Sequence, residues 1–294
     1  MKSTMDRHVS SWRTGHNFKK GGELKPSVKI NYHIHTTFSD GSSSMLDYCE
    51  AAVCKGFEEI AFTDHLTVFP DGSSTAHSLD WLRLENYVKE AEMVREKYGG
   101  RLAVRLGLEA DYIPGIERFL ENVLDSYDFD FIMGSVHFVG GICIDSPKHR
   151  ILMEREIGRI GFNVFYSRYM RLVSKAIETG LFNVLGHIDI VRIWGFNPSN
   201  GVLDEQKVLN LVKKHEMCIE ASSRGLRQPV NSIYPSHRIM RKARELEIPL
   251  TVGTDAHSVE EIDYAYDSLI SYVKAFGYEG IATLSKRRIS ERKI

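Results

Sequence analysis

Six histidines and three acidic residues are spaced along the chain in a way that could bind metal ions. His33 and His35 flank a single apolar residue, so on a strand both imidazoles would point to one face. Asp255 and His257 repeat that spacing near the other end of the chain. The other members of the set are single residues next to apolar runs: Asp40, His65, Glu109, His137 and His187.

Imidazole and carboxylate groups are the ligands with which proteins hold zinc, manganese and iron. Taken alone, a strand histidine is more often a hydrogen-bonded core residue, and Glu109 more often part of an ion pair. Six imidazoles and three carboxylates buried around one point would, however, be very costly without cations. The set is too large for one ion and sufficient for two or three. We therefore expect two or three divalent metal ions, Zn, Mn or Fe.

The segments that must position this set are of two alternating kinds. Apolar, β-branched runs predict seven strands, and the segments between them carry apolar residues at helical spacing. Six of the 12 histidines fall at or near the C-terminal ends of these strands, where the active sites of parallel α/β folds assemble. The predicted strands span residues 28–35, 59–65, 102–109, 129–137, 184–190, 217–222 and 249–257.

Seven strand–helix units predict an α/β fold with parallel strands and outer helices. From the alternation alone, an open doubly wound sheet and a barrel one unit short of eight fit equally well. No linker rich in glycine, proline or serine divides the chain, so we expect one domain over residues 28–285. We interpret residues 1–27 as a polar N-terminal extension and residues 286–294 as a basic C-terminal tail.

The composition disfavours several classes of protein. Lys and Arg number 38 against 39 Asp and Glu, so we expect no nucleic-acid partner. No uncharged apolar run is long enough for a membrane-spanning helix, and the first residues lack the apolar core of a secretory signal. The four cysteines form no C-x-x-C pair, and we expect reduced thiols in a cytoplasmic protein.

The order of short motifs along the chain resembles the polymerase and histidinol phosphatase (PHP) superfamily. The motifs are His33-Ile34-His35, Thr63-Asp64-His65, Gly107-Leu108-Glu109, Gly134-Ser135-Val136-His137, Gly186-His187 and Gly253-Thr254-Asp255-Ala256-His257. The resemblance covers residues 29–274 and implies a distorted, TIM-like (β/α)7 barrel with three metal ions. The first ion would take His33, His35, Glu109 and Asp255, the second Glu109, His137 and His187, and the third Asp40, His65 and His257.

Within this superfamily, two stretches are similar to the histidinol-phosphate phosphatases. They are residues 186–192 and residues 219–227, and Ser222 or its neighbour stands where those proteins usually have asparagine. The resemblance implies hydrolysis of L-histidinol phosphate to L-histidinol and phosphate, a step in histidine biosynthesis. It also implies that Arg192 and Arg227 lie near the substrate phosphate. We expect the catalytic residues to be Glu109, Asp255 and His257.

The charge of the site favours a phosphate substrate. Three divalent ions and three carboxylates would leave about three positive charges, which suits a phosphate dianion and a hydroxide that bridges two metals. We therefore expect a small phosphate ester as the partner, and no membrane. The alternative is a PHP-type phosphoesterase acting on another small ester such as a nucleotide. Two further alternatives are a metal-dependent amidohydrolase, disfavoured because residues 129–137 lack lysine, and a metal-binding protein without activity.

Overall fold

Seven parallel strands form the centre of the computed structural model, which describes residues 28–199 and 204–294. Neighbouring strands pair in the order in which they follow one another along the chain. The first and last strands also meet, because the Tyr32 backbone N–H donates to the Val252 carbonyl at 3.0 Å and Ile34 forms a parallel bridge with Ala256. The seven strands are β1 (Ile30–Asn31), β2 (Glu59–Phe62), β4 (Ala103–Asp111), β5 (Phe131–Ser135), β8 (Val184–Leu185), β9 (Cys218–Ser222) and β10 (Leu250–Gly253).

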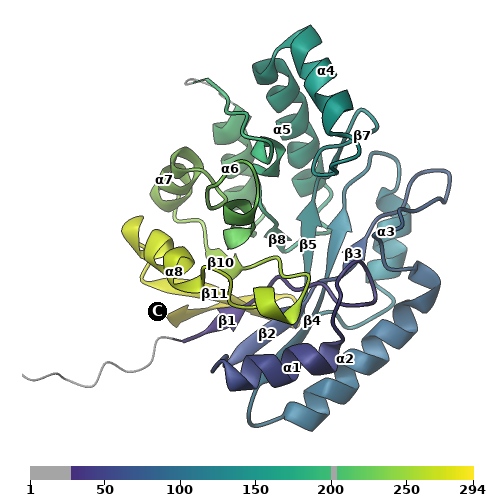
Figure 1. Ribbon diagram of the computed structural model, residues 1–294, viewed down its shortest axis with the longest axis vertical. Coiled ribbons are helices and arrows are strands. Elements are labelled where there is room, and N and C mark those ends of the chain that lie inside the picture. Colours follow the sequence, from purple (N-terminus) through teal and green to yellow (C-terminus); the bar gives the residue numbers. More distant parts are fainter. Residues whose placement is uncertain (1–27, 200–203) are drawn as a thin grey trace, which may run out of the picture.

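The strands therefore form a nearly closed barrel. The predicted (β/α)7 barrel is confirmed, and the open doubly wound sheet is wrong. Helices lie outside the ring of strands, as Figure 1 shows. The α-helices are α1 (Met45–Cys54), α2 (Leu84–Tyr98), α3 (Glu117–Leu124), α4 (Arg150–Ile160), α5 (Phe162–Glu178), α6 (Asp204–Lys214), α7 (His237–Glu245) and α8 (Tyr266–Ala275). Short 3₁₀ turns are η1 (Trp81–Arg83), η2 (Ile190–Arg192), η3 (Ser223–Arg227) and η4 (Val259–Glu261).

Helix α1 illustrates why these segments are helical and where they pack. The Ser44 hydroxyl accepts from the Asp47 backbone N–H, and the Asp47 carboxylate accepts from the Ser44 backbone N–H, which makes a capping box. Its buried face includes Tyr48, whose ring lies edge-on to Phe62 of β2 at 6.3 Å between centroids. The apolar face of the helix is thus fixed against the barrel wall.

The strands themselves are buried on both faces, as expected for a parallel sheet covered by helices. Strand β4 is the longest, and its last residues pair with a separate short strand, β3 (His65–Leu66). In that register His65 lies beside Glu109. A hairpin of β6 (Phe138–Val139) and β7 (Ile142–Cys143) follows β5 at the same end of the barrel. The C-terminal ends of the strands therefore meet at one rim.

The C-terminal residues differ from the sequence expectation. Residues 286–294 were expected to be a solvated basic tail, but they continue a hairpin of β11 (Gly280–Ser285) and β12 (Arg288–Lys293). The Arg287 side chain donates to the Leu181 carbonyl and to Asn183, and the Tyr32 hydroxyl accepts from the Leu284 backbone N–H. The hairpin lies beside the starts of β2, β5 and β8, at the end of the barrel opposite the histidines. Residues 1–27, expected to be an extension, lie outside the described residues.

Over the described residues, no helix combines the length and the apolar character that a bilayer crossing requires.

Candidate metal centre

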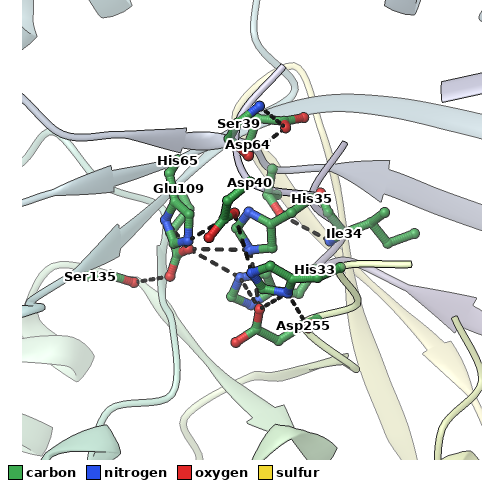
Figure 2. A network of polar contacts seen from close by, with 12 residues as sticks. His33, Ile34, His35, Ser39, Asp40, Asp64, His65, Glu109, Ser135 and Asp255 are labelled. Atoms are coloured by element: carbon green, nitrogen blue, oxygen red, sulfur yellow. Dashed lines mark hydrogen bonds and ion pairs between the residues drawn. The ribbon is translucent and has the colours of Figure 1, made fainter. Parts of the chain in front are cut away.

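All nine side chains predicted to bind metal lie together at the C-terminal rim of the barrel. His33 and His35 come directly after β1, and both point inward while Ile34 between them is buried against the wall (Figure 2). Glu109 stands near the end of β4, at the centre of the group. The others lie on β3 or follow β1, β5, β8 and β10: Asp40, His65, His137, His187, Asp255 and His257.

Glu109 is shared by imidazoles on both of its oxygens. Its Oε2 lies 3.3 Å from His33 Nε2 and 2.9 Å from His65 Nδ1. Its Oε1 lies 3.0 Å from His187 Nε2 and 3.8 Å from His137 Nε2. Because both oxygens face imidazole nitrogens and the side chain is 1% exposed, Glu109 has the geometry of a carboxylate that bridges two ions.

Asp255 and Asp40 complete two further groups. Asp255 Oδ1 lies 3.2 Å from His35 Nε2 and 3.7 Å from His33 Nε2. Asp40 Oδ1 lies 3.3 Å from His257 Nε2. The nine residues fall into four overlapping groups with ligand atoms within 4.8 Å of one another: His33, His35 and Asp255; His33, Glu109 and His187; His65, Glu109 and His137; and His35, Asp40, His65 and His257.

The groups overlap more than the sequence-based division into three sites. His65 and His137 share Glu109, and His187 groups with His33, whereas the division had placed Glu109, His137 and His187 on one ion. His35 also joins the group of Asp40, His65 and His257. The assignment of ligands to individual ions stays a prediction. The groups overlap, so one side chain could serve two neighbouring ions.

The donor set fits divalent metal ions. Within the described residues, several buried atoms of the cluster have no hydrogen-bond partner, and such groups are rare in native proteins. They include both ring nitrogens of His35 and one atom each of four other residues: His33 Nε2, Asp40 Oδ1, Glu109 Oε2 and Asp255 Oδ1. Imidazole nitrogens and carboxylate oxygens left free in this way are what Zn, Mn or Fe would bind.

Electrostatics keeps the acids ionised and one imidazole neutral. Burial alone would raise the pKa of Glu109, but the charges of His33 and His65 hold it well below its usual range. Burial, with the charges of His65 and His257, lowers the pKa of His35 to about 3. Ionised carboxylate and neutral imidazole are the protonation states that a metal requires.

Two buried acids behind the cluster orient its imidazoles, and both were missed by the sequence analysis. Glu220 Oε1 lies 2.7 Å from His33 Nδ1, and Asp111 Oδ1 lies 2.9 Å from His137 Nδ1. In each case the carboxylate accepts from Nδ1–H, so that Nε2 faces the cluster. The position of Asp111 could have been recognised from the sequence, because it stands two residues after Glu109 on the same strand face. No spacing of this kind pointed to Glu220 on β9.

Asp64 holds the loop that carries Asp40. Its Oδ1 accepts from the backbone N–H of Thr36 at 2.8 Å and from that of Ser39 at 3.1 Å. Figure 2 shows Asp64 beside Ser39. The loop is tight as well, since a Cβ on Gly41 would lie 2.1 Å from the His35 carbonyl oxygen. Asp64 thus supports Asp40 through the backbone of its loop.

Neither of the two arginines predicted near the substrate phosphate lines the pocket at the cluster. Arg192 donates to Asp189 at 2.7 Å, and Arg227 donates to the backbone carbonyls of Thr254 and Asp255 at 3.1 and 2.8 Å. Their role with the phosphate stays a prediction. Arg224, which the sequence analysis did not single out, lies 3.0 Å from Asp255 Oδ1 instead. That pocket is lined by Asp40, His65, Thr67, Thr75, His77, Asp111, His137, Phe138, Cys143, Asp145, Ser146, Pro147 and Arg224.

Comparison with known proteins agrees with this geometry. The model of the PHP domain family matches residues 31–224. A protein of Deinococcus radiodurans named "Probable histidinol-phosphatase" is 32% identical, over 83% of this chain and 92% of its own length. The "Histidinol-phosphatase" of Bacillus subtilis is 30% identical, over 82% of this chain and 98% of its own length.

A solved structure has the same fold. The histidinol phosphate phosphatase of Lactococcus lactis, in complex with zinc, L-histidinol and phosphate, superimposes with a TM-score of 0.67. It is 22% identical in sequence and covers 89% of this chain and 98% of its own. The matching family model, the relatives and the barrel with its rim of histidines and acids lead to one conclusion: this chain belongs to the PHP domain family.

Proposed function

We propose that this chain is a metal-dependent phosphomonoesterase that hydrolyses L-histidinol phosphate to L-histidinol and phosphate. The observation that supports this most is the convergence of buried ligand atoms that form no hydrogen bond, above all His33 Nε2, His35 Nε2 and Glu109 Oε2. A polynuclear metal site in a PHP protein indicates phosphoester hydrolysis. When bound, divalent ions activate water and offset the charge of the phosphoryl group.

The protein side chains would serve this reaction in distinct ways. Glu109 would join two ions, since its two oxygens face different imidazoles. Asp255 would hold an ion with Oδ1, the oxygen that lies nearest to His35. His257, whose side chain is 23% exposed beside Asp40, would hold an ion at the solvent side of the cluster, and its catalytic role stays a prediction. Glu220 and Asp111 would keep His33 and His137 in the orientation that binding needs.

The substrate itself is proposed from the relatives. Two relatives at 30% identity or more carry the name histidinol-phosphatase, and the Lactococcus lactis protein was crystallised with L-histidinol and phosphate. The pocket beside the cluster contains three acids, Asp40, Asp111 and Asp145, which suit a substrate that carries an ammonium group next to its phosphate. The cytoplasmic location stays a prediction.

The experiment is a substrate screen on the chain purified with Mn or Zn, with the metal content measured on the same sample. Phosphate release from L-histidinol phosphate is compared with that from nucleoside monophosphates and from a generic aryl phosphate. We expect kcat/KM to be highest for L-histidinol phosphate. Equal turnover of the generic ester would refute the substrate, and a preference for nucleotides would favour the alternative phosphoesterase.

Two variants test the cluster in the same assay. His33→Ala and Glu109→Ala should abolish turnover and lower the metal content, because each removes a group that faces several ligand atoms. His215→Ala, which changes a histidine after helix α6 outside the cluster, is the control and should keep both. Full activity in His33→Ala or Glu109→Ala would rule out the proposed site.

A further inference from the structure

The 3₁₀ turn η3, immediately after strand β9, fixes the backbone of Arg224. The Ser222 hydroxyl accepts from the Arg224 backbone N–H at 3.4 Å, and Ser222 pairs with Tyr234 in an antiparallel bridge. A Cβ on Gly225 would lie 2.1 Å from the Ser232 carbonyl oxygen, so the turn packs tightly against the next segment. The direction in which Arg224 leaves the turn is therefore determined by the fold.

The Arg224 guanidinium reaches over the metal-ligand cluster. One terminal nitrogen lies 3.0 Å from Asp255 Oδ1 and 3.5 Å from His257 Nδ1, and the other lies 3.9 Å from Asp145 Oδ2. Asp145 is itself held, because its Oδ1 accepts from the Cys143 thiol at 3.2 Å. The two carboxylates hold the guanidinium between them, at the wall of the pocket.

Arg224 retains hydrogen-bonding capacity in this position. A guanidinium has five N–H donors and no acceptor. The Arg224 side chain is 15% exposed and lines the pocket together with Asp40, His65 and His137, and its two terminal nitrogens carry four of the five N–H groups. Free donors on a fixed cation at a pocket wall suit an oxyanion, since guanidinium and phosphate can form two parallel hydrogen bonds.

Charge also distinguishes Arg224 from the other residues that line the pocket. Among its lining residues in the described part of the chain, Arg224 is the only lysine or arginine, while Asp40, Asp111 and Asp145 are acidic. Arg192 and Arg227 face other groups, as described above. Among the described residues that line the pocket, Arg224 is therefore the only guanidinium that an entering phosphate would meet.

We propose that Arg224 binds the phosphate group of the substrate, beside the metal ions, and so selects for phosphate esters. This inference rests on the proposed function, because it places the phosphate at the same cluster. It adds Arg224 to Arg192 and Arg227, whose role with the phosphate, implied by the family resemblance, stays a prediction.

The test uses inorganic phosphate as the probe on the metal-loaded full chain. The dissociation constant of phosphate is measured by calorimetry, the metal content by elemental analysis, and KM and kcat with L-histidinol phosphate. Arg224→Met should weaken phosphate binding about 10- to 100-fold and raise KM in proportion, with the metal content unchanged. Arg224→Lys should weaken it about 3- to 10-fold, because the charge stays and the planar fork is lost.

The control is Arg159→Met, which removes the same charge from an exposed pair with Glu156 on helix α4. It should bind phosphate within about twofold of the wild type. If Arg224→Met loses metal, Arg224→Lys decides the question. The inference is overturned if the Arg224 variant that keeps its metal binds phosphate within twofold of the wild type. It is also overturned if phosphate binding falls in Arg192→Met or Arg227→Met instead.

The two proposals fail in different ways. If the wild type binds phosphate through Arg224 but hydrolyses no phosphate ester, the proposed function is wrong and the role of Arg224 stands. If the wild type hydrolyses L-histidinol phosphate while Arg224→Met binds phosphate as tightly, the proposed function stands and the role of Arg224 is wrong.

Discussion

Replacement of Glu220 by glutamine should weaken metal binding, although Glu220 is not expected to touch a metal. Glu220 is fully buried, and its two oxygens accept from two different groups. Oε1 lies 2.7 Å from His33 Nδ1, and Oε2 accepts from the His187 backbone N–H at 2.7 Å. One carboxylate thus orients the ring of one predicted ligand and the backbone of another.

The magnitude follows from counting donors and acceptors. Glutamine offers one oxygen and one NH2 group, so either His33 Nδ1–H or the His187 N–H must face a donor. A buried donor left without an acceptor costs about 1–3 kcal/mol. Loss of an outer carboxylate that orients a metal-binding histidine weakens metal affinity about 10- to 100-fold in known sites. We expect Glu220→Gln to show both effects.

The assay separates the two effects with a matched variant. Glu205 is also buried, and it accepts from the Tyr166 hydroxyl and from Arg238, away from the cluster. Metal affinity is measured by competition with a chelator, and the free energy of unfolding by denaturant titration of the metal-free chain. Glu205→Gln should lose stability alone. If Glu220→Gln binds metal as tightly as Glu205→Gln does, the reasoning about Glu220 is refuted.

Three further changes have expected outcomes. Removal of metal by a chelator should lower the Tm, since an ion present at 1,000 times its Kd stabilises the fold by about 4 kcal/mol per site; an unchanged Tm would argue against metal at the cluster. Gly253→Ala should lower both the free energy of unfolding and the metal affinity, because its Cβ would lie 2.3 Å from Glu220 Oε1. The control is Gly158→Ala on α4, whose Cβ would meet no atom within 4 Å, and it should lower neither quantity in the same unfolding and chelator assays. Zinc binding at pH 7 should release protons from His65 and His137, so its calorimetric heat should depend on the ionisation enthalpy of the buffer; equal heats in Pipes and Hepes would contradict this.

Much of the barrel could be predicted because its strands are covered on both faces. Their apolar runs are nearly continuous, and the histidines stand where those runs end. The two-residue spacing of His33 and His35 correctly predicted that both rings share one face, and Ile34 between them is fully buried. Residue types and spacing were thus sufficient to identify the rim and to bring together the side chains on it.

The extent of the first strand was not predictable in this way. Residues 28–35 were expected to form one strand, but β1 is only Ile30–Asn31. The side chain of Asn31 takes over backbone hydrogen bonds at this point: its Oδ1 accepts from the backbone N–H groups of His33 and Thr254, both at 3.1 Å. The spacing of apolar residues does not show where a side chain replaces the backbone hydrogen bonds between strands.

Long-range contacts account for the other differences. Residues 286–294 look like a tail from their basic charge, yet Arg292 lies 3.2 Å from Glu59 and the segment pairs with β11. Glu220 and Arg224 were missed for the same reason, because their importance depends on which strands and turns lie beside them in the barrel. Neighbours in sequence do not carry that information.

The charged groups of the cluster pair with one another when no metal is bound. Burial alone would lower the pKa of His65 and of His137, but the charges of nearby acids, Glu109 for His65 and Asp111 for His137, raise them to about 9 and about 10. Both imidazoles are therefore in the positively charged form at pH 7 and pair with these acids. A raised histidine pKa contributes stability that is fully present below pH 6.5 and is lost as the pH rises through 9 to 10. A metal ion must displace these protons, so the metal affinity should increase with pH over the same range. The same side chains thus form an ion-pair network without metal and a binding site with it.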